Sequence, residues 1–454
     1  MEKYLARRLA EYAAGVRFGD LAPETVHEVR RRVLDSLGCA YGAYDSPVGT
    51  RVRGAARAES ASLGASIIGI PRHRSTLPMA AFANGAMIRY LDFNDTYLSL
   101  EPAHPSDNIS ACIAAAQSVS APGEELITAI ALAYEVQCRM CDATSIRARG
   151  WDHVTYGCFS TALAAGKLLG LDESALEQAV NLAGVNAAAV RQTRVGHLSD
   201  WKGCAFANAA RNGVFAALLA AQGVSGPNEI FEGPMGFCKQ VSGPLPIKPE
   251  DWRAPSMILR TSIKFWPAEY HSQSAIDAAL QLRNVVGEWQ RIESIGIHSF
   301  DAAVDIIGSE PEKWRPTTRE TADHSMPYCV AVALIDGEVG LAQFVDERIR
   351  RSDVVRLMDR THILRDPELT ARYPEGIPNR LQIRTDDGKR HTLEVTYPRG
   401  HARNPMTDEE VRSKYRALAA PHLSSEGIRR LEGMVAQLQT VRPSVLMAAT
   451  CKGR

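Results

Sequence analysis

Residues 91–108 gather most of the side chains that acid–base chemistry requires: carboxylates, a hydroxyl, an amide and an imidazole. They follow an apolar run of small residues (79–88) that is typical of a buried helix. Pro102 and Pro105 prevent that helix from continuing, so we expect an irregular loop. Because a rigid scaffold holds such a loop in place, it is a common location of binding and catalytic groups.

Within this loop, His104 and Asp92 are the first catalytic candidates. An imidazole can exchange a proton near neutral pH, and a carboxylate can orient it. The remaining polar side chains, Asp95, Ser106 and Asp107, also fit a purely structural role as helix caps, for which Asp and Ser are preferred.

Three further catalytic candidates lie outside the loop. His153 follows Trp151 and Asp152 at a predicted helix start, a position that attracts anions; a surface capping histidine is the alternative. Lys202 and Lys264 each lie beside large aromatic residues at the end of an element, where an ammonium group can bind a substrate carboxylate. Chance placement is the alternative for the two lysines.

Two more polar clusters occur at predicted helix starts in the second half of the chain. One places Glu269 two residues before His271, and the other places His324 four residues before Tyr328. We assign Glu269, His271 and His324 to substrate binding and Tyr328 to proton donation. A core tyrosine is the alternative for Tyr328.

Composition narrows the class of protein. The 454 residues carry a formal net charge of zero and contain no basic block, so nucleic-acid binding has no support. No apolar run reaches the ~18 residues that a membrane span requires, and we expect a cytoplasmic protein. The nine scattered cysteines are typical of reduced, buried thiols, and the Cys138–Cys141 pair lies in a helical pattern that gives it little redox character.

The order of predicted elements indicates a mainly α fold with a smaller α+β domain. Residues 1–254 and 401–454 are expected to form one large all-α domain, with helices over 23–41, 109–118, 124–146, 153–170, 173–190, 204–223, 407–418 and 425–438. Residues 255–400 are expected to form the smaller domain, with strands over 257–264 and 291–298, helices over 272–286 and 325–335, and a hairpin of 381–384 with 392–395.

The sequence lacks the motifs of several common mechanisms. It contains no GxSxG elbow, phosphate-binding loop, dinucleotide glycine fingerprint or HExxH motif, and no clustered set of metal ligands. The polar clusters therefore indicate acid–base chemistry without cofactor or metal on a small molecule that carries several negative charges.

Several of these motifs together resemble the MmgE/PrpD family. They run in the family's order from near the N-terminus to about residue 340: Leu34–Cys39, Asp92–Thr96, His104–Asn108, Ser199–Lys202, Ile263–Lys264, Pro267–His271 and Asp323–Tyr328. The family includes 2-methylcitrate dehydratases, cis-aconitate decarboxylases and an iminodisuccinate epimerase. The resemblance implies a large all-α domain, a smaller α+β domain, a homodimer and catalysis without metal or iron–sulfur cluster.

The resemblance also bears on individual residues. The decarboxylase's active-site positions correspond to Asp92, Thr96, His104, His153, Lys202, Lys264 and Tyr328. This adds Thr96 as a substrate-binding candidate. The chain departs from the decarboxylase at Glu269, where that enzyme has a histidine, and the continuation after His104 is more similar to the dehydratases.

The resemblance thus implies a metal-independent hydro-lyase that dehydrates a hydroxy tricarboxylate such as 2-methylcitrate to 2-methyl-cis-aconitate. A decarboxylase of the cis-aconitate type, an epimerase or racemase of a small dicarboxylate, and a non-catalytic dimer that only binds a carboxylate are the alternatives.

Overall fold

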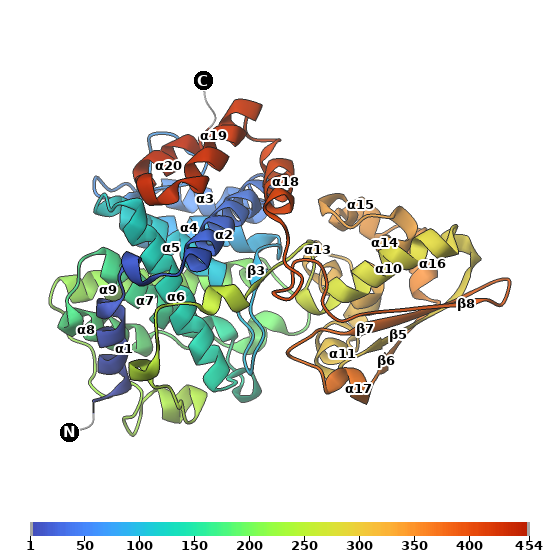
Figure 1. Ribbon diagram of the computed structural model, residues 1–454, viewed down its shortest axis with the longest axis horizontal. Coiled ribbons are helices and arrows are strands. Elements are labelled where there is room, and N and C mark those ends of the chain that lie inside the picture. Colours follow the sequence, from blue (N-terminus) through green and yellow to red (C-terminus); the bar gives the residue numbers. More distant parts are fainter. Residues whose placement is uncertain (1–2, 452–454) are drawn as a thin grey trace. The chain divides into compact units, whose positions relative to one another are not determined.

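The computed structural model describes residues 3–451, which divide into two units with separate internal packing (Figure 1). The larger unit comprises the chain up to Arg194, Asp200–Thr261 and the chain from Thr407 onwards. The smaller unit comprises Val195–Ser199 and Ser262–Met406. These boundaries fall a few residues after the predicted ones at 254 and 400.

The larger unit is almost entirely helical, as predicted. Its helices are α1 (Leu5–Gly15), α2 (Pro23–Gly42), α3 (Pro47–Arg57), α4 (Leu77–Tyr90), α5 (Ile109–Ser118), α6 (Gly123–Ala143), α7 (Gly157–Leu168), α8 (Glu173–Val185), α9 (Trp201–Ala221), α18 (Asp408–Ala419), α19 (Ser425–Ala436) and α20 (Pro443–Ala449). Its strands are two residues long: β1 (Ala65–Ser66), β2 (Arg74–Ser75) and β3 (Asp95–Thr96). The predicted helices exist, with their ends displaced by a few residues.

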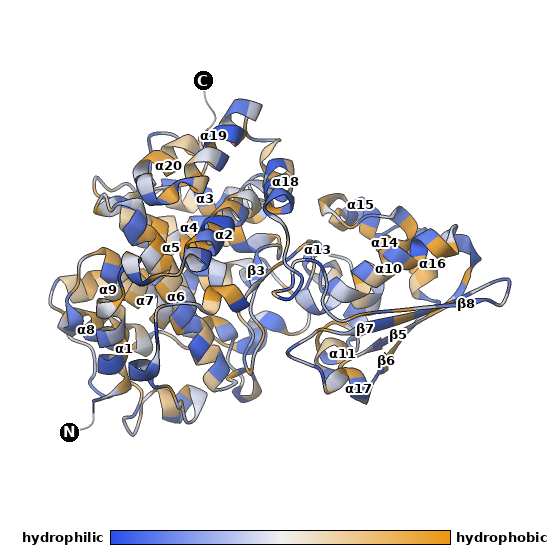
Figure 2. Cartoon of the chain, viewed as in Figure 1, coloured by the Kyte–Doolittle hydropathy of each residue, from blue (hydrophilic) through white to orange (hydrophobic). Residues whose placement is uncertain are grey.

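The core of this unit is built from helices rich in alanine and other small or apolar residues. Every residue of α5 except Ser118 is buried, and α4 is buried along most of its length. Figure 2 shows hydrophobic residues along α5 and α9, whereas α18 carries mostly hydrophilic ones. Small side chains allow the helix backbones to approach closely, which places the loop between α4 and α5 on a densely packed support.

Helix α9 is the one helix among the described residues that is long and apolar enough, by length and composition, to cross a membrane. Counting uninterrupted apolar residues in the sequence had not revealed it. However, 61% of its apolar window is buried within the protein, and the helix packs against α4, α7 and α8. This burial is the pattern of a core helix.

The C-terminal helices belong to the larger unit, as the sequence suggested. Thr407 caps α18 in a reciprocal capping box with Glu410, which the spacing of the two residues predicted. Helix α18 packs on α2, and Lys414 forms an ion pair with the buried Asp35 at 2.7 Å. The Lys414 ammonium also donates a hydrogen bond to the Phe93 carbonyl at 2.5 Å, so the last part of the chain supports the 91–108 loop.

The smaller unit is an α+β structure around a four-stranded mixed sheet of order β6–β5–β7–β8. Its strands are β4 (Ser262–Ile263), β5 (Ile292–Ser299), β6 (Thr361–Arg365), β7 (Asn379–Thr385) and β8 (Arg390–Val395). Its helices are α10 (Gln273–Val286), α11 (Asp301–Ile307), α12 (Pro311–Trp314), α13 (Arg319–Ala322), α14 (Met326–Asp336), α15 (Asp346–Ile349), α16 (Ser352–Met358) and α17 (Pro367–Thr370). The predicted hairpin is confirmed as antiparallel β7 and β8, and α10 packs on both strands.

One predicted strand needs correction, and one strand was not predicted. The predicted strand 257–264 is a 3₁₀ turn at Met257–Arg260 followed by the two residues of β4. The buried Glu135 carboxylate of α6 accepts the backbone N–H groups of Ser256 and Met257, at 2.8 and 2.9 Å, and this favours a turn over an extended chain. Strand β6, parallel to β5, was missed because its residues are half exposed and show no clear apolar alternation.

Candidate active site

Residues 91–108 connect α4 to α5 in the larger unit, and the backbone turns sharply at Asp92. This residue has a φ of 50°, in the left-handed region that few residues other than glycine adopt. Backbone strain of this kind concentrates at functional sites. Beyond Asp92, the backbones of Tyr97 and Ala103 form two reciprocal hydrogen bonds that close a hairpin. A 3₁₀ turn (Pro105–Asn108) then leads into α5. The loop is therefore held at its ends and in its middle.

His104 and His153 are brought together, with ring centroids 5.7 Å apart. The Nδ1 atom of His104 lies 2.7 Å from the backbone carbonyl oxygen of Asp95. The Nδ1 atom of His153 lies 2.9 Å from a carboxylate oxygen of Asp152. Because each Nδ1 is engaged by an acceptor, Nε2 is the ring nitrogen through which each histidine would exchange a proton. In His153, this Nε2 is buried and has no hydrogen-bond partner among the described residues.

The two histidines differ in the charge of the group behind them. Asp152 is fully buried, caps the turn that carries His153 and accepts a hydrogen bond from Arg194 Nε at 2.9 Å. Burial alone would raise the pKa of Asp152, but the Arg194 guanidinium and the His153 ring hold it well below its usual range. An ionised carboxylate therefore supports His153, whereas a neutral peptide carbonyl supports His104.

Arg194 also connects the histidine pair to Lys202, because its guanidinium donates to the Lys202 carbonyl at 3.1 Å. Lys202 is the second residue of α9 and is almost fully buried, and its ammonium nitrogen lies 3.7 Å from Asp92. Asp92 in turn forms an ion pair with Arg89 of α4. Three cations, Arg89, Lys202 and Arg194, thus lie close to Asp92 and the histidine pair.

Asp107 is a buried acid with a shifted pKa. It is buried, accepts a hydrogen bond from Asn94 at 2.8 Å and lies 3.8 Å from Arg89 Nε. Burial raises the pKa of Asp107 to about 8, although Arg89 opposes the shift. Asp107 is therefore mainly protonated at neutral pH and does not cancel the charge of Arg89.

Sequence reasoning missed two of the three cations. A signal existed for Arg89, since an arginine three residues before Asp92 on an apolar helix can form an ion pair with it. No local signal existed for Arg194, whose partners Asp152 and Lys202 are brought to it by the tertiary fold. The predicted candidate Thr96 is buried, and its hydroxyl donates to the Ala103 carbonyl at 3.3 Å, within the loop hairpin.

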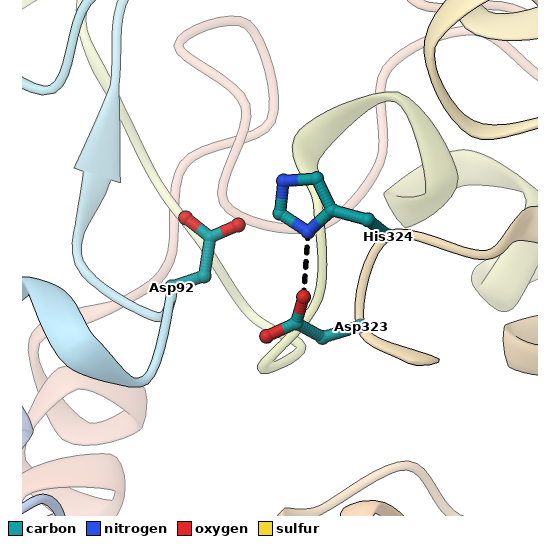
Figure 3. A group of neighbouring side chains, drawn as sticks. All are labelled: Asp92, Asp323 and His324. Atoms are coloured by element: carbon teal, nitrogen blue, oxygen red, sulfur yellow. Dashed lines mark hydrogen bonds and ion pairs between the residues drawn. The ribbon is translucent and has the colours of Figure 1, made fainter. Parts of the chain in front are cut away.

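The smaller unit holds the other predicted substrate-binding residues in a second polar cluster. Glu269 caps the turn that carries His271 and accepts the ring Nδ1–H at 2.7 Å. His324 is paired with Asp323 at 2.5 Å (Figure 3). Burial alone would raise the pKa of Glu269, but His271, His324 and Lys264 lower it to about 2. The cluster therefore combines two carboxylate–imidazole pairs with a buried lysine.

Tyr328 is the predicted proton donor of the smaller unit. It lies in α14, fully buried, and its hydroxyl donates to the Gln343 carbonyl beside the Phe344 ring. Burial raises the pKa of the phenol. These contacts match the core tyrosine that the sequence left as the alternative, and the role of Tyr328 as a proton donor stays a prediction.

Among residues 3–451, no three His, Cys, Asp or Glu side chains of the same unit lie close enough together to share a metal ion. Among these residues the cysteines are free thiols. Cys138 and Cys141 are buried in α6, and burial raises the pKa of both thiols, which keeps them protonated and unreactive.

The fold and these motifs agree with comparisons to known proteins. Residues 7–250 match the MmgE/PrpD N-terminal domain, and residues 266–440 match the MmgE/PrpD C-terminal domain. The chain therefore belongs to the MmgE/PrpD family.

Its relatives include two kinds of lyase. The 2-methylcitrate dehydratase of Escherichia coli K12 is 30% identical, over 82% of this chain and 81% of the relative. The enzyme of the same name from Cupriavidus necator is also 30% identical, over 85% and 84%. The cis-aconitate decarboxylase of Mus musculus is 26% identical, over 100% and 94%. These relatives show that the protein is an enzyme, and both kinds of relative are lyases.

Proposed function

We propose that the protein is a hydro-lyase that dehydrates a hydroxy tricarboxylate such as 2-methylcitrate to 2-methyl-cis-aconitate. The observation that carries this proposal is the unequal support of His104 and His153. A neutral carbonyl behind His104 favours a ring with a basic Nε2, and an ionised carboxylate behind His153 favours a ring that carries an acidic proton. A dehydration needs one group of each kind.

The reaction follows from these roles. His104 Nε2 removes a proton from the carbon beside a substrate carboxylate. The bond from the neighbouring carbon to its hydroxyl oxygen then breaks, His153 gives that oxygen a proton, and water leaves as the double bond forms. The ring separation of 5.7 Å suits two proton transfers on one small molecule, since each requires a heavy-atom distance of about 2.6–3.2 Å.

The cations around the loop supply the electrostatic part of the mechanism. Removing a proton beside a carboxylate builds up negative charge, and preorganised cations stabilise such charge before the leaving group departs. Lys202 and Arg89 are buried next to Asp92, so solvent screens them weakly. We assign them to the substrate's carboxylates. In the smaller unit, Lys264 remains a predicted catalytic residue, and Glu269, His271 and His324 remain predicted substrate-binding residues.

The decisive experiment monitors the ultraviolet absorbance of the conjugated alkene after purified protein is mixed with 2-methylcitrate or citrate. A parallel sample contains a chelator, because the proposed mechanism uses no resident metal. A rise that resists the chelator is the expected result. A rise that the chelator abolishes would contradict the metal-free mechanism, and no rise with either acid would contradict the proposed substrate class.

The decarboxylase relatives give one specific reason to test a second function. Decarboxylation leaves a carbanion that the same cations can stabilise, and it requires an acid but no base. Carbon dioxide release from cis-aconitate by both wild-type protein and a His104→Ala variant would favour this alternative. Loss of optical rotation without alkene formation would instead indicate an epimerase.

A homodimer and a cytoplasmic location complete the proposal. Both follow from the family resemblance and from the composition of the chain, and sedimentation of the purified protein together with fractionation of cells tests them. A binding protein without catalysis would show thermal stabilisation by carboxylates but no turnover.

A further inference from the structure

A backbone carbonyl contacts one ring nitrogen of the proposed base, His104, and bears on its tautomer. A carbonyl oxygen can only accept a hydrogen bond, so the 2.7 Å contact with the Asp95 carbonyl requires a proton on His104 Nδ1. In the neutral ring, Nε2 then carries the lone pair. Any movement of the Asp95 peptide group that weakens this contact would allow the other tautomer, in which Nε2 is protonated and cannot act as a base.

Both carboxylate oxygens of the Asp95 side chain are held by neighbouring groups. One carboxylate oxygen accepts the Ser106 backbone N–H at 3.0 Å. The other accepts the Tyr134 hydroxyl at 2.6 Å and lies 3.5 Å from Arg32 Nε. Asp95 and Tyr134 are completely buried and Arg32 is 3% exposed, so water does not compete for these contacts.

The two anchors come from core helices far away in the sequence. Burial raises the pKa of Tyr134, and the Asp95 carboxylate raises it further. The phenol therefore remains a hydrogen-bond donor at any working pH. Arg32 of α2 is itself held by Glu28 at 2.5 Å and by the Thr261 carbonyl at 3.0 Å. The polar contacts of Tyr134 and Arg32 are with Asp95, Glu28 and Thr261, and not with His104.

We propose that Tyr134 and Arg32 are positioning residues that act through Asp95. By holding its carboxylate they aim its carbonyl at His104, and so they keep His104 in the tautomer with a basic Nε2. This inference rests on the proposed role of His104 as the base, but it makes a statement about a tautomer that can be measured without any substrate.

The test is the ¹⁵N spectrum of the histidine rings in wild-type protein and in a Tyr134→Phe variant, with His104 assigned by its loss in His104→Asn. The substitution removes only the hydroxyl. The matched control is Tyr41→Phe, which removes another buried hydroxyl that donates to a carbonyl (Thr450, 2.6 Å). We expect protonated Nδ1 and unprotonated Nε2 in the wild type and in Tyr41→Phe, and a shift towards the other tautomer in Tyr134→Phe.

Kinetics provide a second, independent readout. Outer partners that orient metal-binding histidines are typically worth about 10–100-fold in activity. We expect a similar scale here, so kcat of Tyr134→Phe should fall by about tenfold or more while KM stays within about twofold. If Tyr134 acts only through Asp95, adding Tyr134→Phe to Asp95→Asn should cause little further loss. The control Tyr41→Phe should retain wild-type kcat.

Two results would overturn the inference. One is a wild-type His104 protonated on Nε2, which requires no variant to fold. The other is a folded Tyr134→Phe protein with unchanged His104 nitrogen shifts. Failure of the proposed function is distinguishable from both: a wild-type protein without dehydratase activity but with the expected tautomer change in Tyr134→Phe would refute the assigned reaction and support the network.

Discussion

Replacing Asp107 by asparagine tests the electrostatics of the loop most directly. The asparagine side chain keeps the oxygen that accepts the Asn94 hydrogen bond at 2.8 Å, and it has nearly the same volume. It cannot ionise. Any difference between Asp107→Asn and the wild type that depends on pH therefore reports the protonation of Asp107 next to Arg89.

The expected magnitude follows from the pKa of Asp107, about 8 in the folded protein, against about 3.9 for an unfolded aspartate. Between these two values the folded protein holds one more proton than the unfolded chain. The free energy of unfolding of the wild type therefore falls as the pH rises, by about 1.4 kcal/mol per pH unit from this group. Between about pH 5 and pH 7, the wild type should lose about 3 kcal/mol relative to Asp107→Asn.

Urea denaturation at both pH values measures this difference, and an infrared difference spectrum at neutral pH should show a protonated carboxylic acid in the wild type alone. Above about pH 8, ionised Asp107 competes with the substrate for Arg89, so KM should rise in the wild type and stay level in Asp107→Asn. Parallel loss of stability in the two proteins, with no infrared band, would show that Asp107 is ionised and refute the reasoning.

Other substitutions test separate parts of the structure. His104→Ala should lower kcat by about 10²–10⁴-fold without changing the thermal midpoint, because it removes the base alone; near-normal turnover would contradict its role. Lys264→Ala should abolish turnover in the same assay while the fold stays cooperative. Thr407→Ala should lower the free energy of unfolding by about 1 kcal/mol, with normal kcat, by removing the α18 cap. Lys414→Met should lower it by about 3–5 kcal/mol in urea denaturation, since it leaves Asp35 buried without its cation; a smaller loss than Thr407→Ala would contradict this.

The sequence predicted the fold well wherever local patterns determine the structure. Helices such as α2 begin at a proline and bury residues at helical spacing, and the hairpin of β7 and β8 follows from a turn with Gly388 between alternating residues. The prediction failed at Met257–Arg260, because the choice between turn and strand depends on Glu135, which lies far away in the sequence. Short apolar runs are ambiguous without such tertiary contacts.

The candidate residues of the site were predictable by type but not by role. His104 and His153 stood out because polar residues interrupt apolar helices there, yet nothing local shows that one faces a carbonyl and the other a carboxylate. The same holds for the groups behind the loop. Tyr134 and Arg32 belong to helices whose sequences read as ordinary core helices, and only the fold brings them to Asp95.

The balance of charge around the loop explains how a site rich in acids can bind an anionic substrate. Asp92 is matched by both Arg89 and Lys202, and Asp152 is matched by Arg194 and the His153 ring. Asp107, with a pKa of about 8, adds no negative charge at neutral pH. The three cations Arg89, Lys202 and Arg194 therefore exceed the two ionised carboxylates, Asp92 and Asp152, with which they pair. A tricarboxylate carries about three negative charges at neutral pH, and these charges balance the excess of cations at the site.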